Sequence, residues 1–144
     1  MKTSARNQLR GKVSQVIRGV INNRVMIDIG EGVELCALIT DAACKELGLD
    51  QQPGNEVIVL FKASSIFLVD HNESYDYSAR NQLQGEVISI EKGPANAEVV
   101  LKLVSGQLLT AVVTRKAADE TWIQVGSTTL ALIKASHLIL AVPR

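Results

Sequence analysis

Hydrophobic and polar residues alternate with a period of two over several short stretches of the chain. In the first half, residues 25–29 (VMIDI) and 35–39 (LCALI) show this alternation, which is typical of β-strands. Turn-forming residues at 22–23 (NN) and 30–32 (GEG) separate these stretches from their neighbours. We therefore predict a meander of three strands with short connections over residues 9–39.

One short helix is predicted between the third and the fourth strand. Thr40 can cap a helix over residues 41–47, and Gly48 can end it. A threonine hydroxyl accepts a backbone N–H at a helix start, and glycine readily adopts the left-handed conformation that closes a helix. Apolar runs predict two further strands, at residues 57–61 and 66–69. The predicted order is β-β-β-α-β-β.

The same order is predicted in the second half, because the chain repeats itself at an offset of 74 positions. The segment SARNQLRGKV at residues 4–13 returns as SARNQLQGEV at residues 78–87. The triplet KAS at residues 62–64 returns at 134–136, after a deletion of two residues in the second copy. In this copy we expect strands at 99–103, 109–113, 130–133 and 138–140, and a short helix near 115–121 behind Thr114.

Five strands with a helix before the fourth are typical of the small OB barrel. We predict an all-β protein with short helices, built from two tandem OB-like five-stranded β-barrel modules. The modules span residues 1–70 and 78–144, and the polar, acidic segment 71–77 reads as the linker between them. Barrels of this size have cores of marginal stability, so we expect copies or chains to pack against one another.

The composition argues against several classes of protein. The chain has 144 residues, 47% of them hydrophobic, and its 15 Lys and Arg residues balance 15 Asp and Glu residues. The apolar fraction argues against a disordered chain, and the absence of a basic excess argues against nucleic-acid and membrane-surface partners. No apolar run reaches the roughly 18 residues of a membrane span, and no signal-peptide core follows the first residues. We expect a cytoplasmic protein.

The repeat also separates shared chemistry from incidental residues. Cys36, Cys44 and His137 have no counterpart of the same type in the other copy, and their spacing does not match the usual spacing of metal ligands. We therefore expect two reduced, buried thiols and no metal held directly by side chains.

The polar residues common to both copies are mostly hydrogen-bond donors: Ser, Arg, Asn, Gln, Thr and Lys. No Asp or Glu occurs in both copies beside them, so no general base is available and we do not expect an enzyme. Such donors suit a compact, fully ionised oxyanion. Hydrogen phosphate would leave its proton without an acceptor, at a cost of about 1–3 kcal/mol, whereas sulfate and molybdate carry no such proton.

Each of these residues also has an ordinary structural explanation. Arg6 and Lys62 could be solvated surface charges, and Thr40 could be a helix cap alone. The amides of Asn7 and Gln8 could satisfy the backbone instead of a ligand. Their occurrence in two otherwise divergent copies favours a binding role for the set as a whole.

The segment Ser-Ala-Arg-Asn-Gln-Leu, followed some 55 residues later by Lys-Ala-Ser, resembles the Mop or TOBE molybdate-binding module. Two such modules in one short chain resemble the molbindins of the tandem, di-Mop type. The resemblance implies a homotrimer that holds molybdate, with tungstate possible, at interfaces between modules. It also implies a role in intracellular molybdenum storage, with no organic cofactor.

The resemblance implies one class of oxyanion site and its twin in the other copy, in which each threonine comes from a neighbouring module, and additional oxyanions near the three-fold axis of the trimer. Ala43 and Ala117 stand where relatives can have a further serine. The candidate oxyanion-binding residues are Ser4, Arg6, Asn7, Thr40, Lys62, Ala63 and Ser64 in the first copy, and Ser78, Arg80, Asn81, Thr114, Lys134, Ala135 and Ser136 in the second.

The alternative is an OB-type module that binds single-stranded nucleic acid. Such a protein needs a basic groove with stacking aromatic residues. The chain is neutral, and Phe61, Phe67 and Trp122 have no aromatic counterpart in the other copy. The sequence therefore favours the oxyanion.

Overall fold

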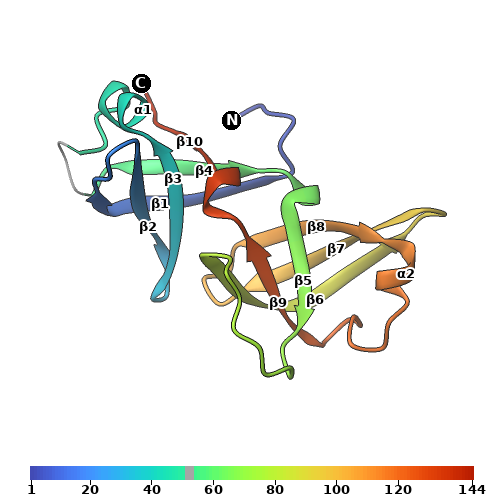
Figure 1. Ribbon diagram of the computed structural model, residues 1–144. Coiled ribbons are helices and arrows are strands. Elements are labelled where there is room, and N and C mark those ends of the chain that lie inside the picture. The colour runs from blue at the N-terminus through green and yellow to red at the C-terminus, as the bar shows by residue number, and fades with distance from the viewer. Residues whose placement is uncertain (51–53) are drawn as a thin grey trace.

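A computed structural model describes residues 1–50 and 54–144 of the chain (Figure 1). The first copy contains β1 (Asn7–Ile17), β2 (Asn22–Gly30), β3 (Val33–Thr40), α1 (Asp41–Glu46), β4 (Glu56–Phe61), the short 3-10 turn η1 (Ala63–Ser65) and β5 (Ile66–Asp70). The second contains β6 (Asn81–Lys92), β7 (Asn96–Leu103), β8 (Leu108–Thr114), α2 (Arg115–Ala118), β9 (Thr128–Ile133), the 3-10 turn η2 (Ala135–His137) and β10 (Ile139–Ala141).

The predicted fold class is confirmed: the protein is mostly β, with two five-stranded OB-like sheets and short helices. Two local predictions were wrong. Asn22 and Asn23 lie within β2, where the buried Asn23 amide accepts from the Gly19 N–H and donates to Asp41. The second helix ends at Ala118 instead of continuing to residue 121, and a loop follows it.

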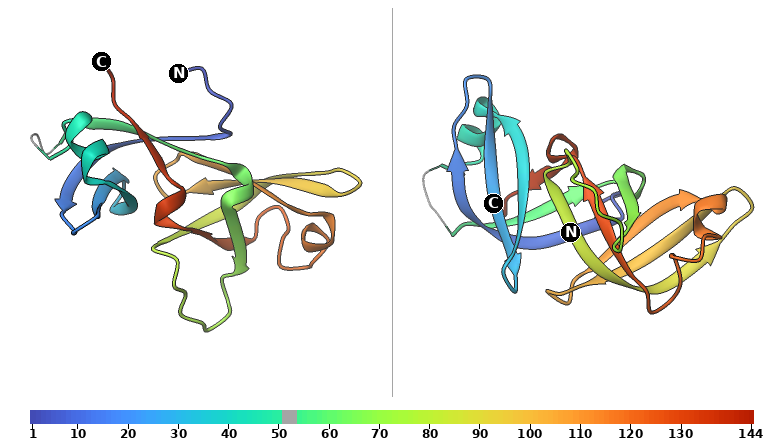
Figure 2. Two further views of the ribbon diagram at one scale, coloured as in Figure 1. Left: turned by 45° about the horizontal axis from the view of Figure 1, so that its top comes forward. Right: turned by 60° about the horizontal axis from the view of Figure 1, so that its bottom comes forward.

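The two copies exchange their last strands. One sheet has the order β10-β4-β1-β2-β3 and the other the order β5-β9-β6-β7-β8. The last strand of each copy therefore completes the sheet of the other, with Ile139 opposite Leu60 in one sheet and Ile66 opposite Ile133 in the other. Figure 1 shows β5 and β10 crossing between the two sheets, and Figure 2 shows the same crossing from two further sides.

The exchange joins the hydrophobic interiors of the two sheets. Leu138 and Leu140, at the end of the chain, are buried and belong to the same core cluster as Leu9 and Val59 of the first copy. Ile139, which lies between the two leucines, points outward and is 64% exposed. The apolar run that predicted a strand at residues 138–140, observed as β10 at Ile139–Ala141, therefore buries its leucines in a core that both copies share.

A glycine common to both copies allows the first two strands of each sheet to cross closely. A β-carbon at Gly11 would lie 2.5 Å from Ile27 Cγ2 and 2.8 Å from the Asp28 carbonyl oxygen. At the equivalent Gly85 it would lie 2.9 Å from the β-carbon of Leu101. Two separate sheets thus need glycine at the same place.

Gly11→Ala is expected to lower the free energy of unfolding by about 1–3 kcal/mol, because the backbone of β2 must move away. Urea denaturation measures this change. The neighbouring exposed Lys12 is a suitable control, since Lys12→Ala should change stability by less than about 0.5 kcal/mol. Equal effects of the two substitutions would show that the strands separate easily.

Candidate anion-binding site

Strand register brings the two motifs of the second copy together. β6 and β9 are antiparallel neighbours, with Asn81 opposite Ile133. Arg80 precedes Asn81 and Lys134 follows Ile133, so the two cations lie at the same end of adjacent strands. The residues Ser78, Ala79, Arg80, Lys134, Ala135 and Ser136 line one pocket of about 400 Å³. We call the polar members of this group, Ser78, Arg80, Lys134 and Ser136, the Arg80 site.

The first copy supplies the opposite side of this pocket. Leu38 of β3 and Phe67 of β5 line it together with the second-copy residues. This arrangement follows from the fold, because η2 packs against β3 and β5 lies in the second sheet. The Arg80 site therefore lies between the two copies.

The polar groups around this pocket are hydrogen-bond donors with positive charge. Arg80 offers a planar guanidinium group, Lys134 an ammonium group, and Ser78 and Ser136 hydroxyl groups. No carboxylate is among the described residues that line the pocket. Arg80 and Lys134 are both exposed, so an anion from solvent can reach them.

The equivalent group in the first copy is arranged in the same way but meets an acidic residue. Asn7 lies opposite Phe61, which puts Arg6 and Lys62 at neighbouring strand ends. We call Ser4, Arg6, Lys62 and Ser64 the Arg6 site. The Arg6 guanidinium donates two hydrogen bonds to Glu98 of β7, at 2.5 and 2.9 Å. These bonds, and the attraction between the charges, raise the pKa of Arg6 and lower the pKa of Glu98.

Comparison of the two copies did not identify Glu98 as a residue of the Arg6 site. The residue at the equivalent position of the first copy is Arg24, so position 98 was not among the shared polar residues. Its register partner is Val112, in the β7–β8 pair of the other sheet. Only a knowledge of how the copies pack could place its carboxylate beside Arg6.

The two threonines are helix caps, as the sequence predicts. The Thr40 hydroxyl accepts the N–H of Ala43 at 3.1 Å, and the Thr114 hydroxyl accepts the N–H of Ala117 at 3.1 Å. Both side chains are exposed, at the ends of β3 and β8. Neither threonine lines the pocket of the Arg80 site.

Asn7 and Asn81 connect the two sheets. Each is 1% exposed. The Asn81 amide accepts from the Cys36 N–H at 2.7 Å and donates to the Cys36 carbonyl at 2.9 Å. Asn7 makes the same pair of bonds to the backbone of Thr110, both at 2.8 Å. For Asn7 this is the structural role that the sequence left open, its counterpart Asn81 has the same role, and the bonds occupy both ends of each side chain.

Cys36 and Cys44 are buried thiols without a disulfide, as predicted. Burial raises the pKa of the Cys36 thiol, while the positive charges of Arg80 and Arg24 oppose this rise.

Within residues 1–50 and 54–144, no group of three or more His, Cys, Asp and Glu residues could hold a metal ion. Over the same residues, no helix has the length and hydrophobicity needed to cross a membrane.

The two copies match a known domain. The TOBE domain matches residues 3–68 and again residues 77–140. The chain therefore belongs to the TOBE domain family and carries two copies of the domain.

Several curated proteins are similar in sequence. The molybdenum-pterin-binding protein MopA of Rhodobacter capsulatus is 41% identical over 143 residues, which cover 99% of this chain and 53% of MopA. The molybdenum transport protein ModE of Azotobacter vinelandii is 42% identical over 142 residues, which cover 99% of this chain and 52% of ModE. The chain thus spans about half the length of these relatives. A probable molybdenum-pterin-binding protein of Haemophilus influenzae is 46% identical over 68 residues, 47% of this chain and 96% of that protein.

A solved structure shares the whole architecture. The cytoplasmic molybdate-binding protein ModG, crystallised with molybdate bound, superposes with a TM-score of 0.93 at 41% identity. The match covers 99% of this chain and 100% of ModG.

Proposed function

We propose that this protein binds molybdate without catalysis and serves as a molybdenum store in the cytoplasm. Tungstate, a tetrahedral oxyanion of the same charge, is proposed as a second ligand. The proposal is supported by the similarity to ModG, a cytoplasmic molybdate-binding protein that was crystallised with its ligand.

The observation that carries the proposal is the set of side chains in the Arg80 site. A tetrahedral dianion accepts hydrogen bonds in several directions and donates none. Arg80, Lys134 and the two serines can supply such bonds from several sides, and the bonds from the two cations are reinforced by charge. A ligand that must also donate, such as hydrogen phosphate, finds no carboxylate among the described residues of the pocket.

We also propose that the chain assembles into a homotrimer, the assembly that the family resemblance implies. Phe67 and Ile139 occupy equivalent positions on the exchanged strands β5 and β10 and are 68% and 64% exposed. Both strands lie at the edge of their sheet. Exposed apolar side chains on edge strands favour association with a further chain.

Arg80→Ala is expected to weaken molybdate binding at its site about 10-fold to 100-fold, because one charge-assisted hydrogen bond contributes about 1.5–3 kcal/mol. Equilibrium dialysis with molybdate, tungstate, sulfate and phosphate as competing anions measures this loss. The barrel should remain folded, since Arg80 is exposed.

Arg10 provides the matched control for this experiment. It is also an exposed arginine, and it lies on β1 outside the residues that line the Arg80 pocket. Arg10→Ala should leave molybdate binding unchanged. Equal weak binding of all four anions, or equal effects of the two arginine substitutions, would contradict the proposed function.

A further inference from the structure

The two candidate sites differ in charge at one position of the repeat. Position 24 in the first copy is arginine and the equivalent position 98 in the second copy is glutamate. The two positions have the same place in the fold: Arg24 lies opposite Leu38 in the β2–β3 pair, and Glu98 lies opposite Val112 in the β7–β8 pair. A single substitution therefore reverses the charge at one of two otherwise equivalent places.

At the Arg6 site the glutamate at this position opposes the binding of an anion. Glu98 accepts from both terminal nitrogens of the Arg6 guanidinium. The two side chains are 53% and 36% exposed, so the pair is accessible to solvent and can open. An anion that binds Arg6 must compete with this carboxylate, and it is repelled by the carboxylate if the pair opens only partly.

Near the Arg80 site the same position carries a positive charge, on a side chain that lies outside the residues lining the pocket. Asn81, the residue after Arg80, is hydrogen-bonded to the backbone of Cys36 on β3. Two residues further along β3, Leu38 lines the pocket that contains Arg80. Arg24 is the register partner of Leu38, and directly opposed residues of a strand pair lie on the same face of the sheet.

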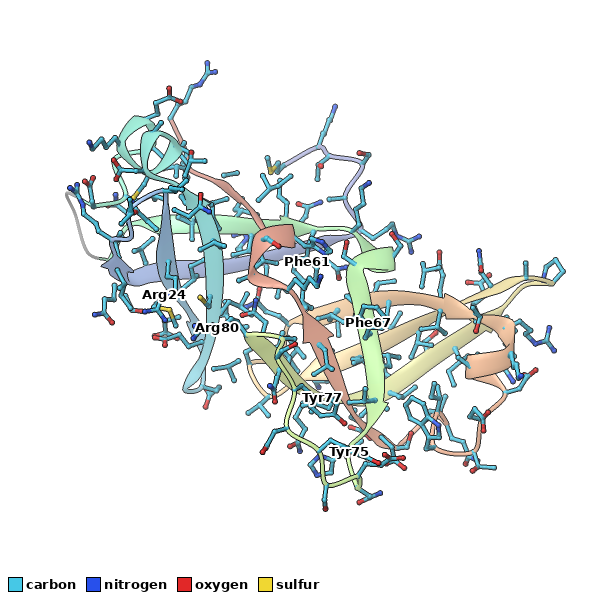
Figure 3. The ribbon with its side chains drawn as sticks, in the orientation of Figure 1. Arg24, Phe61, Phe67, Tyr75, Tyr77 and Arg80 are labelled. Carbon is cyan, nitrogen blue, oxygen red and sulfur yellow. The ribbon has the colours of Figure 1, made fainter. Side chains whose placement is uncertain are left out.

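Two further observations agree with a position of Arg24 near the Arg80 site. Both arginines act on the Cys36 thiol, whose pKa they lower against burial and against the charge of Glu34, a carboxylate that accepts a hydrogen bond from Ser14. In Figure 3 both are labelled close to β3. In the described part of the chain, neither Arg24 nor Arg80 forms an ion pair. Two guanidinium groups near one pocket without a carboxylate partner attract an anion more strongly than one.

We propose that the two oxyanion sites of the chain are unequal: Arg24 is an additional anion-binding residue of the Arg80 site, and Glu98 weakens the Arg6 site by competing for its arginine. This inference rests on the proposed function. The Arg80 site fills first as molybdate rises, and the Arg6 site fills at higher concentration. One protein then binds the same anion over a wider range of concentrations than two identical sites would.

The test isolates each site in the full-length protein. Arg6→Ala leaves the Arg80 site as the intact one, and in this background Arg24→Gln should weaken molybdate binding about tenfold. Arg80→Ala leaves the Arg6 site as the intact one, and in this background Glu98→Gln should tighten molybdate binding about tenfold. Isothermal titration calorimetry at low ionic strength measures both, because salt screens charges that are exposed.

Glu91 offers a control for the second comparison. It acts on Arg6 only through its charge, with no hydrogen bond to the guanidinium. Glu91→Gln in the Arg80→Ala background should therefore change binding less than Glu98→Gln does. An equal effect of the two substitutions would overturn the role given to Glu98, and unchanged binding after Arg24→Gln would overturn the role given to Arg24.

The outcomes also separate this inference from the proposed function. If the unmodified chain binds molybdate no better than sulfate or phosphate, the proposed function itself fails. If molybdate binds selectively and both arginine backgrounds lose a site, but the two remaining sites have equal affinity, only the inequality of the sites is wrong.

Discussion

Replacement of Asn81 by alanine is expected to lower the free energy of unfolding by about 2–5 kcal/mol. The Asn81 amide satisfies both the N–H and the carbonyl of Cys36, a residue that is only 5% exposed. Cys36 lies on β3, the edge strand of its sheet, so no further strand can take over these two groups. Each buried backbone group left without a partner costs about 1–3 kcal/mol. Urea denaturation followed by circular dichroism measures the loss.

Two comparisons make this prediction specific. Gln84 is exposed on the same strand, and Gln84→Ala should change stability by less than about 0.5 kcal/mol. Asn7→Ala removes the equivalent bonds to Thr110, which is only half-buried, so water can replace part of what is lost and the effect should be smaller. An Asn81 variant as stable as the Gln84 variant would mean that the Cys36 backbone has another partner.

The strands themselves could be predicted because their alternation reflects local geometry. Residues 25–29 and 35–39 fall within β2 and β3 as expected, and Thr40 begins the helix that the sequence places after it. The sequence does not predict which sheet the last strand of each copy joins. β5 and β10 are both short apolar strands, and either could pair with β4 or with β9, so sequence patterns alone do not distinguish the two pairings.

At the site, too, contacts within one copy could be predicted from the sequence, and contacts between the copies could not. Arg80 and Lys134 could be paired from the sequence, since the motifs that contain them precede and follow strands in the same order in both copies. Glu98 could not be placed beside Arg6, because its approach depends on the packing of one sheet against the other. Asn81 was recognisable as a shared residue, but its role depends on an edge strand of the other sheet. The contacts between the two copies therefore cannot be predicted from the repeated sequence alone.

Separation of the two copies is expected to abolish folding as a monomer. In a fragment of residues 77–144, β9 loses its neighbour β5, and β10 loses its neighbour β4. Leu138 and Leu140, which are 3% and 8% exposed in the whole chain, would then face water. Exposure of two such leucines costs about 3–6 kcal/mol together, which approaches the whole stability of a small domain.

The same fragment is expected to fold as a dimer, because the exchange can occur between two identical copies. In the whole chain, Ile139 lies opposite Leu60 of β4, and the equivalent of Leu60 in the second copy is Leu132 of β9. Each β10 can therefore complete the sheet of a partner molecule with the register seen here.

Sedimentation equilibrium combined with thermal denaturation tests this expectation, since a dimer that folds only on association becomes more stable as concentration rises. Leu140→Asp should prevent both dimerisation and folding of the fragment. The matched change Ile139→Asp, at the 64% exposed position beside it, should leave the dimer folded, because its side chain is not needed in the shared core. A fragment that unfolds cooperatively as a monomer, at a temperature independent of concentration, would show that the last strand can return to its own sheet. The exchange would then be a property of the tandem chain and not of the single copy.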